Sequence, residues 1–217
     1  EGPFARVVLT VMGLGSMAVG GLFMLRQRDF KRMLAYSSVE HMGILVLGVG
    51  LGGNAVFGSL LHLVNNGLAK GAIFLSAANI HRAFGSQTIE GTTGAMKMVP
   101  ASGALFLLAF FAVTGSPPFG PFVSEFTILD AAVAGGHYGV VAAFLVMLVI
   151  IFMGMGATVL SVVQGKPQPG AGPKQPETWL TVAPVVAFMV LVLALGLYVP
   201  PPLEALLREA ATLGVAP

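Results

Sequence analysis

Apolar runs of about 20 residues recur along the whole chain, and this feature limits its possible folds most strongly. A run of that length can cross the roughly 30 Å hydrocarbon core of a bilayer as one α-helix. Inside a bilayer the backbone must satisfy its own hydrogen bonds, so repeated runs predict helices and not open sheets. Only 9% of the residues are charged, whereas soluble domains carry about 25%. We therefore expect an all-α polytopic membrane protein.

The runs predict about six transmembrane helices, one of them broken. Their expected bounds are 4–25, 33–51, 56–80, 101–134, 140–163 and 179–199, followed by a short amphipathic tail at 203–213. The fourth run contains Gly115, Pro117, Pro118, Gly120 and Pro121, and prolines cannot continue a regular helix. Irregular backbone is tolerated at membrane depth only where protein buries it or where it lines a polar cavity. The break therefore indicates a functional region, with a plain loop between two short helices as the simpler alternative.

Basic residues are concentrated in three of the expected loops, 26–32, 81–100 and 164–177. These loops hold eight of the 11 lysines and arginines, namely Arg26, Arg28, Lys31, Arg32, Arg82, Lys97, Lys166 and Lys174. Loops rich in Lys and Arg stay on the cytoplasmic side, so we expect all three to be cytoplasmic in a multi-pass protein of the inner cell membrane. Since the basic residues flank apolar runs, we expect contact with the lipid bilayer and not with nucleic acid.

The third span carries an unusual polar face within residues 60–76. Its His62, Asn66 and Lys70 follow i, i+4, i+8 spacing, which places them on one side of a helix. Lys70 lies 11 residues before His81, roughly 16 Å from that end of the helix. A lysine near the bilayer centre costs roughly 2.5–3.5 kcal/mol and usually faces a bundle interior or a water-filled path.

Other ionisable residues are expected at the same depth: Glu40 and His41 in the second span, and Glu125 just after the break. Burial disfavours the charged forms of both carboxylates and lysines, so both can exchange protons near neutral pH. Histidine is a natural intermediate carrier. We expect a proton relay from Glu40 and His41 through His62 and Lys70 to Glu125. Water would have to bridge the roughly 12 Å between His62 and Lys70.

Structural explanations of the same residues stay open at this point. Lys70 snorkels towards the interface or pairs with one carboxylate, His62 is a hydrogen-bonded packing residue, and Glu40 with His41 anchors the helix near the interface. The whole chain would then be a membrane scaffold. The chain has no cysteine, its histidines lack the spacing of a metal site, and no nucleophile–base arrangement or phosphate loop is evident. We therefore expect no cofactor and no metal in this chain.

Three ordered segments resemble the antiporter-like proton-translocating subunits of complex I, Mrp-type antiporters and membrane-bound hydrogenase complexes. They are residues 29–43, 62–70 and 115–126, and the resemblance extends over about 4–163. The sequence AYSSVEHMG at 35–43 looks most like hydrogenase-4 component F. The resemblance implies two inverted five-helix repeats, each with one broken helix.

In that family pattern, residues 1–163 correspond to the second repeat, and 164–217 form a loop, an extra transmembrane helix and the amphipathic tail. The chain would then be a fragment or a split gene product. Lys70 matches the family lysine before the broken helix, His62 a histidine of the central polar axis, and Glu125 the terminal ionisable residue. Asn66 stands where some relatives have a second histidine, so a water is expected to carry the proton there.

The resemblance implies a non-redox subunit of a hydrogenase-4-like or formate hydrogenlyase-like complex that moves protons. Its expected partners are other membrane subunits and a peripheral, hydrogenase-like redox arm. Two alternatives within the family are an antiporter-like subunit of NADH-quinone oxidoreductase and an Mrp-type Na⁺/H⁺ antiporter subunit.

Overall fold

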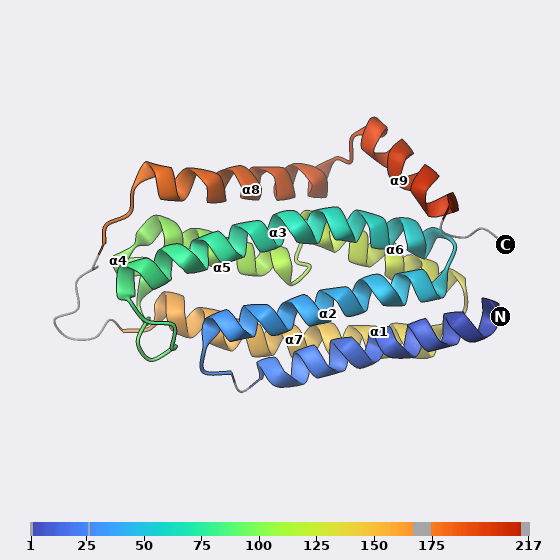
Figure 1. Ribbon diagram of the computed structural model, residues 1–217, viewed down its shortest axis with the longest axis horizontal. Helices are drawn as coiled ribbons and strands as arrows, with labels where there is room; N and C mark the ends of the chain where they lie inside the picture. Colours follow the sequence, from blue (N-terminus) through green and yellow to red (C-terminus); the bar gives the residue numbers. More distant parts are fainter. Residues whose placement is uncertain (1, 26, 167–174, 214–217) are drawn as a thin grey trace.

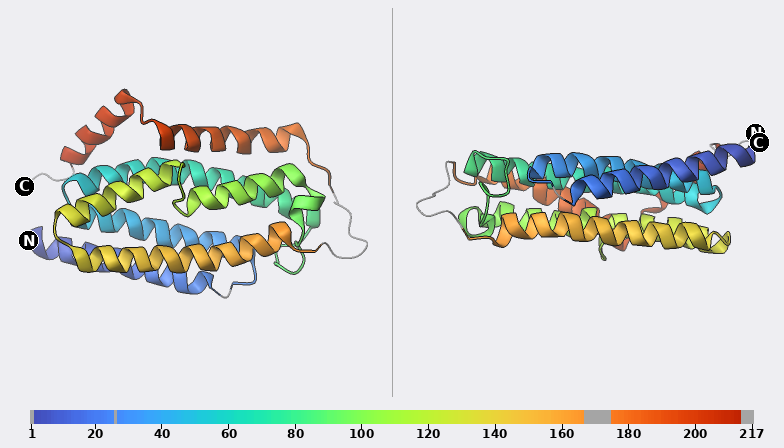
Figure 2. Two further views of the ribbon diagram at one scale, coloured as in Figure 1. Left: turned by 180° about the vertical axis from the view of Figure 1, so that it is seen from behind. Right: turned by 90° about the horizontal axis from the view of Figure 1, so that it is seen from below.

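The computed structural model describes residues 2–25, 27–166 and 175–213, and within them the regular structure is entirely helical. The helices are α1 (Gly2–Met24), α2 (Phe30–Leu51), α3 (Asn54–Phe84), α4 (Ala95–Met98), α5 (Pro100–Val113), α6 (Gly120–Ala134), α7 (Tyr138–Gln164), α8 (Trp179–Leu197) and α9 (Pro201–Leu213). The long helices lie side by side in an elongated bundle (Figure 1). Helices α1–α3 form one layer and α5–α7 the other (Figure 2).

Every expected span corresponds to a helix or to a broken pair of helices. In the described residues, α1, α2, α7 and α8 are long and apolar enough to cross a membrane by length and composition. Helix α3 is longer, with 31 residues, but it carries the polar face. The expected all-α, multi-pass membrane fold is therefore confirmed.

Helix α3 ends at Phe84, four residues beyond the expected end at 80. His81 and Arg82 lie in its last turn, where positive charge is favourable next to the exposed carbonyls. Gly85 then adopts a left-handed conformation, φ 69°, and its N–H bonds to the carbonyl of His81. Polarity alone suggested a loop here, but a basic last turn stabilises a helix end.

The expected break lies between α5 and α6, at residues 114–119. Gly115 has φ 65°, a conformation that a residue with a Cβ adopts only at a cost. Asn65 of α3 donates from Nδ2 to the carbonyl oxygen of Gly120, at 2.8 Å. This bond matters because a broken helix leaves backbone groups without partners inside the membrane. Gly120 and Pro121 lie in the first turn of α6, so the irregular segment is shorter than the glycine and proline pattern suggests.

Helix α3 lies at the centre of the bundle and contacts α2, α5, α6, α8 and α9. Helix α8 covers the break from outside the two layers. Its Gly196 packs so closely on the backbone of the break that a Cβ at this position would lie only 2.7 Å from the nitrogen of Gly120. The amphipathic tail forms α9, whose buried Leu207 packs with Phe57 and Leu61 of α3. Both added helices thus pack on the same central element.

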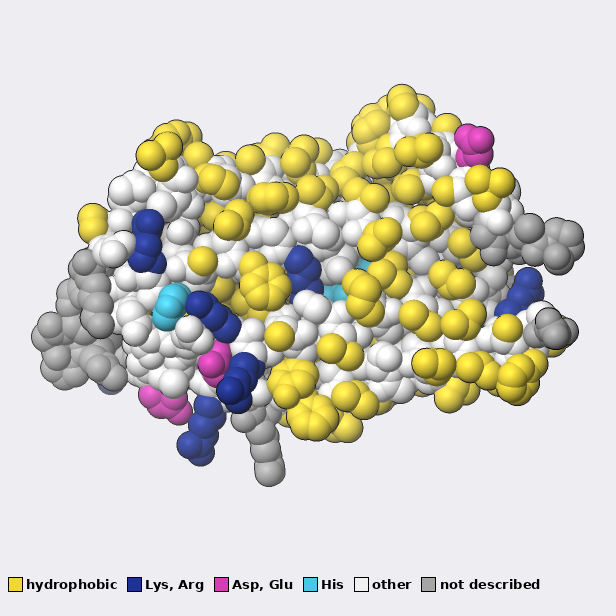
Figure 3. Space-filling view, viewed as in Figure 1, with side chains coloured by type: hydrophobic (Ala, Val, Ile, Leu, Met, Phe, Trp, Pro, Cys, Tyr) yellow, Lys and Arg dark blue, Asp and Glu magenta, His cyan; other side chains and the backbone are white. Residues whose placement is uncertain are grey.

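The described parts of the three basic loops, residues 27–32, 81–100, 164–166 and 175–177, lie at one end of the bundle (Figures 1 and 2). Backbone bonds join Phe30 to Gln87 at 3.2 Å and Ile89 to Arg28 at 3.0 Å. The Thr93 hydroxyl donates to the carbonyl of Lys166 at 2.7 Å. Lys and Arg side chains in view gather mostly at this end, while hydrophobic side chains cover most of the rest (Figure 3). Arg26 and Lys174 of the predicted basic loops lie outside the described residues.

Candidate functional site

Ionisable side chains from both layers meet inside the bundle, where α2, α3 and α6 come together. The exposed fractions are 1% for Glu40 and His41, 0% for His62, 3% for Glu125 and 9% for Lys70. All five therefore lie in the protein interior, as their positions in the spans predict. A buried ionisable group in a membrane bundle is retained at a cost, so the cluster is a candidate functional site.

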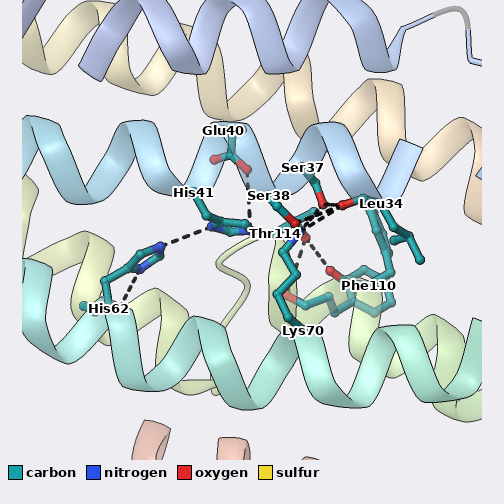
Figure 4. A network of polar contacts seen from close by, with 11 residues as sticks. Leu34, Ser37, Ser38, Glu40, His41, His62, Lys70, Phe110 and Thr114 are labelled. Atoms are coloured by element: carbon teal, nitrogen blue, oxygen red, sulfur yellow. Dashed lines mark hydrogen bonds and ion pairs between the residues drawn. The ribbon is translucent and has the colours of Figure 1, made fainter. Parts of the chain in front are cut away.

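Four side chains form a continuous row from α2 to α6. Glu40 Oε2 lies 3.5 Å from His41 Nε2, His41 Nδ1 lies 3.1 Å from His62 Nε2, and His62 Nδ1 lies 2.9 Å from Ser124 Oγ. The first three lie in one row in Figure 4. Ser124 Oγ also donates to the carbonyl oxygen of Pro121 at 2.9 Å.

The Pro121 carbonyl fixes the direction of this row, because a carbonyl can only accept a hydrogen bond. When the carbonyl accepts the hydrogen bond of the Ser124 hydroxyl, His62 must donate from Nδ1 to Ser124 Oγ, and it accepts a hydrogen bond at Nε2. His41 then donates from Nδ1, which leaves its Nε2 as an acceptor facing Glu40. With both rings neutral, every donor points the same way, so one proton entering at Glu40 can shift the whole row. This is the geometry that proton transfer along a hydrogen-bonded chain requires.

Lys70 occupies a second polar cluster further along α2. Its ammonium group donates to Ser37 Oγ by a short hydrogen bond and to the carbonyl oxygen of Leu34 at 3.4 Å. The Ser37 hydroxyl donates to the same carbonyl at 2.9 Å. Neither Glu40 nor Glu125 forms an ion pair with Lys70 within 4.0 Å. The alternative of a structural lysine–carboxylate pair therefore finds no support in the geometry.

Glu125 lies beside the two histidines and not beyond Lys70. His41, His62 and Glu125 each offer a nitrogen or oxygen atom within 4.8 Å of the others. The position of Glu125 in space differs from the expected order, in which it follows Lys70, because α6 runs antiparallel to α3 (Figure 1). The half-helix after the break runs along the first half of α3, the half that carries His62. Glu125 Oε1 is buried and has no hydrogen-bond partner.

Asn66 lies between the two clusters along α3. It is 5% exposed, and its side-chain Oδ1 has no hydrogen-bond partner. His62, Asn66 and Lys70 are all buried, as expected for one helix face. Asn66 thus presents a buried acceptor without a partner between His62 and Lys70, where the sequence predicts a bridging water.

A groove of about 470 Å³ reaches Glu125 from the surface between α6 and α7. Gly115, Phe122, Phe126 and Asp130 are among its other lining residues. The groove is mostly apolar, but the buried carboxylate and Asp130 supply polar groups along it. The groove therefore connects Glu125 with the outside of the bundle.

Three contributing residues received no role from the sequence: Ser37, Asn65 and Ser124. Ser37 and Ser124 fall within the family-like segments, yet a lone serine in a helix usually bonds to its own backbone. Both serines do so here, and they also bond across helices. Asn65 precedes Asn66 but points to the break. No sequence pattern near these three residues indicates that their side chains bond to another segment and not to their own helix.

Comparison with known proteins identifies related membrane subunits. A family described as "NADH:quinone oxidoreductase/Mrp antiporter, TM" matches residues 1–153. A hydrogenase-4 component F homolog from Methylacidiphilum infernorum is 37% identical over 201 residues, covering 91% of this chain and 40% of that protein. The NADH-quinone oxidoreductase subunit M of Mycobacterium tuberculosis is 27% identical over 206 residues, covering 93% and 36%.

The fold is also found in a solved structure of respiratory complex I from Thermus thermophilus. The TM-score is 0.85 at 24% identity, with 98% of this chain and 45% of that chain covered. The chain thus spans less than half the length of each of these relatives.

Proposed function

The chain belongs to the NADH:quinone oxidoreductase/Mrp antiporter membrane family, and from this we propose that it is part of a proton-translocating subunit of a multi-subunit membrane complex. One observation carries the proposal: the buried row Glu40–His41–His62–Ser124, with Glu125 beside it and Lys70 nearby. Such a row can pass protons without large motions, because two of its three links are hydrogen bonds and the third, from Glu40 to His41, spans 3.5 Å and needs a small side-chain shift.

In this mechanism, Glu40 passes a proton to Nε2 of His41. His41 releases its Nδ1 proton to Nε2 of His62. His62 in turn releases its Nδ1 proton to Ser124 Oγ, while the Ser124 hydroxyl turns away from the Pro121 carbonyl and gives its own proton to the Glu125 carboxylate. Glu125 lies next to both rings and accepts the proton at the buried end of the groove between α6 and α7. Lys70 is a second reservoir, and a water at the unsatisfied Oδ1 of Asn66 connects it with His62. This order replaces the linear order expected from the sequence.

The finer proposal is a hydrogenase-4-like or formate hydrogenlyase-like complex in the inner membrane. The 37% identity to the hydrogenase-4 component F homolog supports it. Redox chemistry would then take place in a peripheral arm, and this chain would supply the ion path. Residues 1–163 would form the second five-helix repeat, with 164–217 added to it, and the loops 26–32, 81–100 and 164–177 would face the cytoplasm.

A quinone-reducing complex is the second candidate, because the NADH-quinone oxidoreductase subunit M aligns with 93% of this chain. The two proposals differ in the reaction of the purified complex. Hydrogen oxidation with an artificial electron acceptor supports the first, and NADH oxidation with a quinone supports the second. Sodium-dependent proton release from vesicles in the absence of either reaction would favour an Mrp-type antiporter.

The relay is tested by Lys70→Met and Glu125→Gln in the full complex, reconstituted in vesicles with a pH-sensitive dye. Both variants should assemble and should lose proton pumping. The matched controls are Lys97→Met and Glu209→Gln, which change exposed residues of the same types. Unchanged pumping in both Lys70→Met and Glu125→Gln would refute the relay and would favour a structural scaffold.

A further inference from the structure

The two buried histidines are held in the arrangement that metal-binding histidines adopt. The inner nitrogens, His41 Nδ1 and His62 Nε2, face one another at 3.1 Å. Of the outer nitrogens, His62 Nδ1 forms a hydrogen bond with Ser124 Oγ at 2.9 Å, while His41 Nε2 lies 3.5 Å from Glu40 Oε2 without a hydrogen bond. A histidine that binds a metal almost always donates its other ring N–H to a carboxylate, carbonyl or similar acceptor, which fixes the ring and its tautomer.

The spacing of the inner nitrogens fits a shared ion. Zinc–nitrogen bonds are about 2.0–2.1 Å long, so two imidazole ligands in a tetrahedral site lie about 3.4 Å apart. The observed distance of 3.1 Å is slightly shorter, and a small shift of either ring would bring it to that value. Glu125 offers a carboxylate oxygen within 4.8 Å of one ring nitrogen of each histidine. Its Oε1 is buried without a hydrogen-bond partner, which leaves that oxygen available to an ion.

We propose that His41, His62 and Glu125 form a binding site for one divalent transition-metal ion of the zinc type. The ion would take the position between the rings, with water completing its coordination. His41 would carry its ring proton on Nε2, towards the Glu40 carboxylate, so that Nδ1 is free to bind. This is the opposite tautomer from the one in the proposed relay, so a bound ion and proton transfer between the two rings exclude one another. The carboxylates of Glu40 and Glu125 together balance the double positive charge, as a buried ion requires.

The site also has an access route. Glu125 lines both the histidine cluster and the groove between α6 and α7. Asp130 lines the same groove and lies exposed on α6, where a carboxylate attracts a cation. The sequence did not predict this site, since its three ligands come from three helices and are separated by 21 and 63 residues.

The test measures binding directly and does not depend on transport, so it is independent of the proposed function. The full-length protein is purified in detergent, freed of metal with a chelator and incubated with Zn²⁺. Elemental analysis after removal of free ions should give about one zinc per chain. Co²⁺ in its place should give the visible absorption bands of a tetrahedral site with nitrogen and oxygen ligands.

Substitutions locate the ion. His62→Gln and Glu125→Gln should each weaken Zn²⁺ binding by at least tenfold, and Ser124→Ala, which removes only the support of His62, by about tenfold. His137→Gln and Glu209→Gln change exposed residues and should bind zinc as the unaltered protein does. If His62→Gln does not fold, Glu125→Gln and Ser124→Ala decide the matter. Absence of stoichiometric zinc, or binding that all three variants retain, overturns the proposal.

Discussion

Helix α2 packs against α1 on one side and against α3 on the other, and the two contacts are built in opposite ways. Against α1 the backbones touch through glycines: a Cβ on Gly43 would lie 2.7 Å from the carbonyl oxygen of Gly13. Against α3 the contact is polar, through Ser37, His41 and Lys70. Close backbone approach stabilises helix pairs in lipid, whereas buried polar atoms without partners lower stability. The first contact therefore maintains the fold, and the second provides the polar groups of the proposed proton path.

The largest expected effect is on the glycine side, from Gly43→Ala. The new methyl group would meet backbone atoms, at 2.7 Å from Gly13 and 2.9 Å from Met17, so the helices must separate. We expect a loss of about 3 kcal/mol in the free energy of unfolding, measured by denaturant titration in detergent micelles. The matched control is Gly15→Ala in α1, where nothing lies within 4 Å of the new Cβ. That variant should be unchanged or more stable by up to about 1 kcal/mol; an equal loss in both would disprove a tight α1–α2 contact.

The positions of the spans, of the break and of the buried ionisable residues could be predicted from the sequence. The spans and the break were predictable because apolar runs of membrane length and a cluster of glycines and prolines are local patterns. The buried positions of Glu40, His62 and Lys70 followed from their distance to the ends of those runs. For the same reason, the structure agrees with the expected spans to within a few residues.

The pairing of residues between helices was not predictable from local patterns. The resemblance implies that Glu125 is the terminal ionisable residue, after Lys70, but α6 runs antiparallel to α3 and brings Glu125 beside His41 and His62. The approach of His41 to His62 depends on how α2 and α3 rotate about their axes, and no residue spacing encodes it. The zinc-type site went unpredicted on the same grounds, because metal-site spacing describes ligands on one segment.

On the polar side, the largest effect should come from Ser37→Ala. Lys70 would lose its serine partner and keep only the 3.4 Å contact with the Leu34 carbonyl. A buried charged donor without its partner costs about 1–3 kcal/mol, and proton pumping should fall because the ammonium group is no longer held in place. Ser38→Ala is the control, since Ser38 bonds only to the Leu34 carbonyl of its own helix. Equal pumping by the two variants would show that Ser37 does not position Lys70.

A smaller effect is expected from Gly115→Ala at the break. Its φ of 65° costs a residue with a Cβ roughly 1–2 kcal/mol, and the methyl group would lie 2.8 Å from the carboxyl carbon of Glu125. We expect moderate destabilisation together with reduced pumping, because the carboxylate must turn away from the histidines. Gly67→Ala, which has open space around its Cβ, should change neither quantity. Full pumping in Gly115→Ala would mean that the position of Glu125 beside His41 and His62 is not needed.

The smallest effect on stability should come from Asn66→Leu, which nevertheless tests the link between the two polar clusters. The Oδ1 of Asn66 is buried without a partner, so an apolar residue of similar size should leave the free energy of unfolding within about 1 kcal/mol. Pumping should still fall, because a leucine cannot hold the water between His62 and Lys70. Asn66→His offers the reverse change and should retain pumping, since an imidazole can carry the proton itself. If Asn66→Leu pumps normally, protons reach Glu125 from Glu40 through the histidines alone, and Lys70 acts only through its charge.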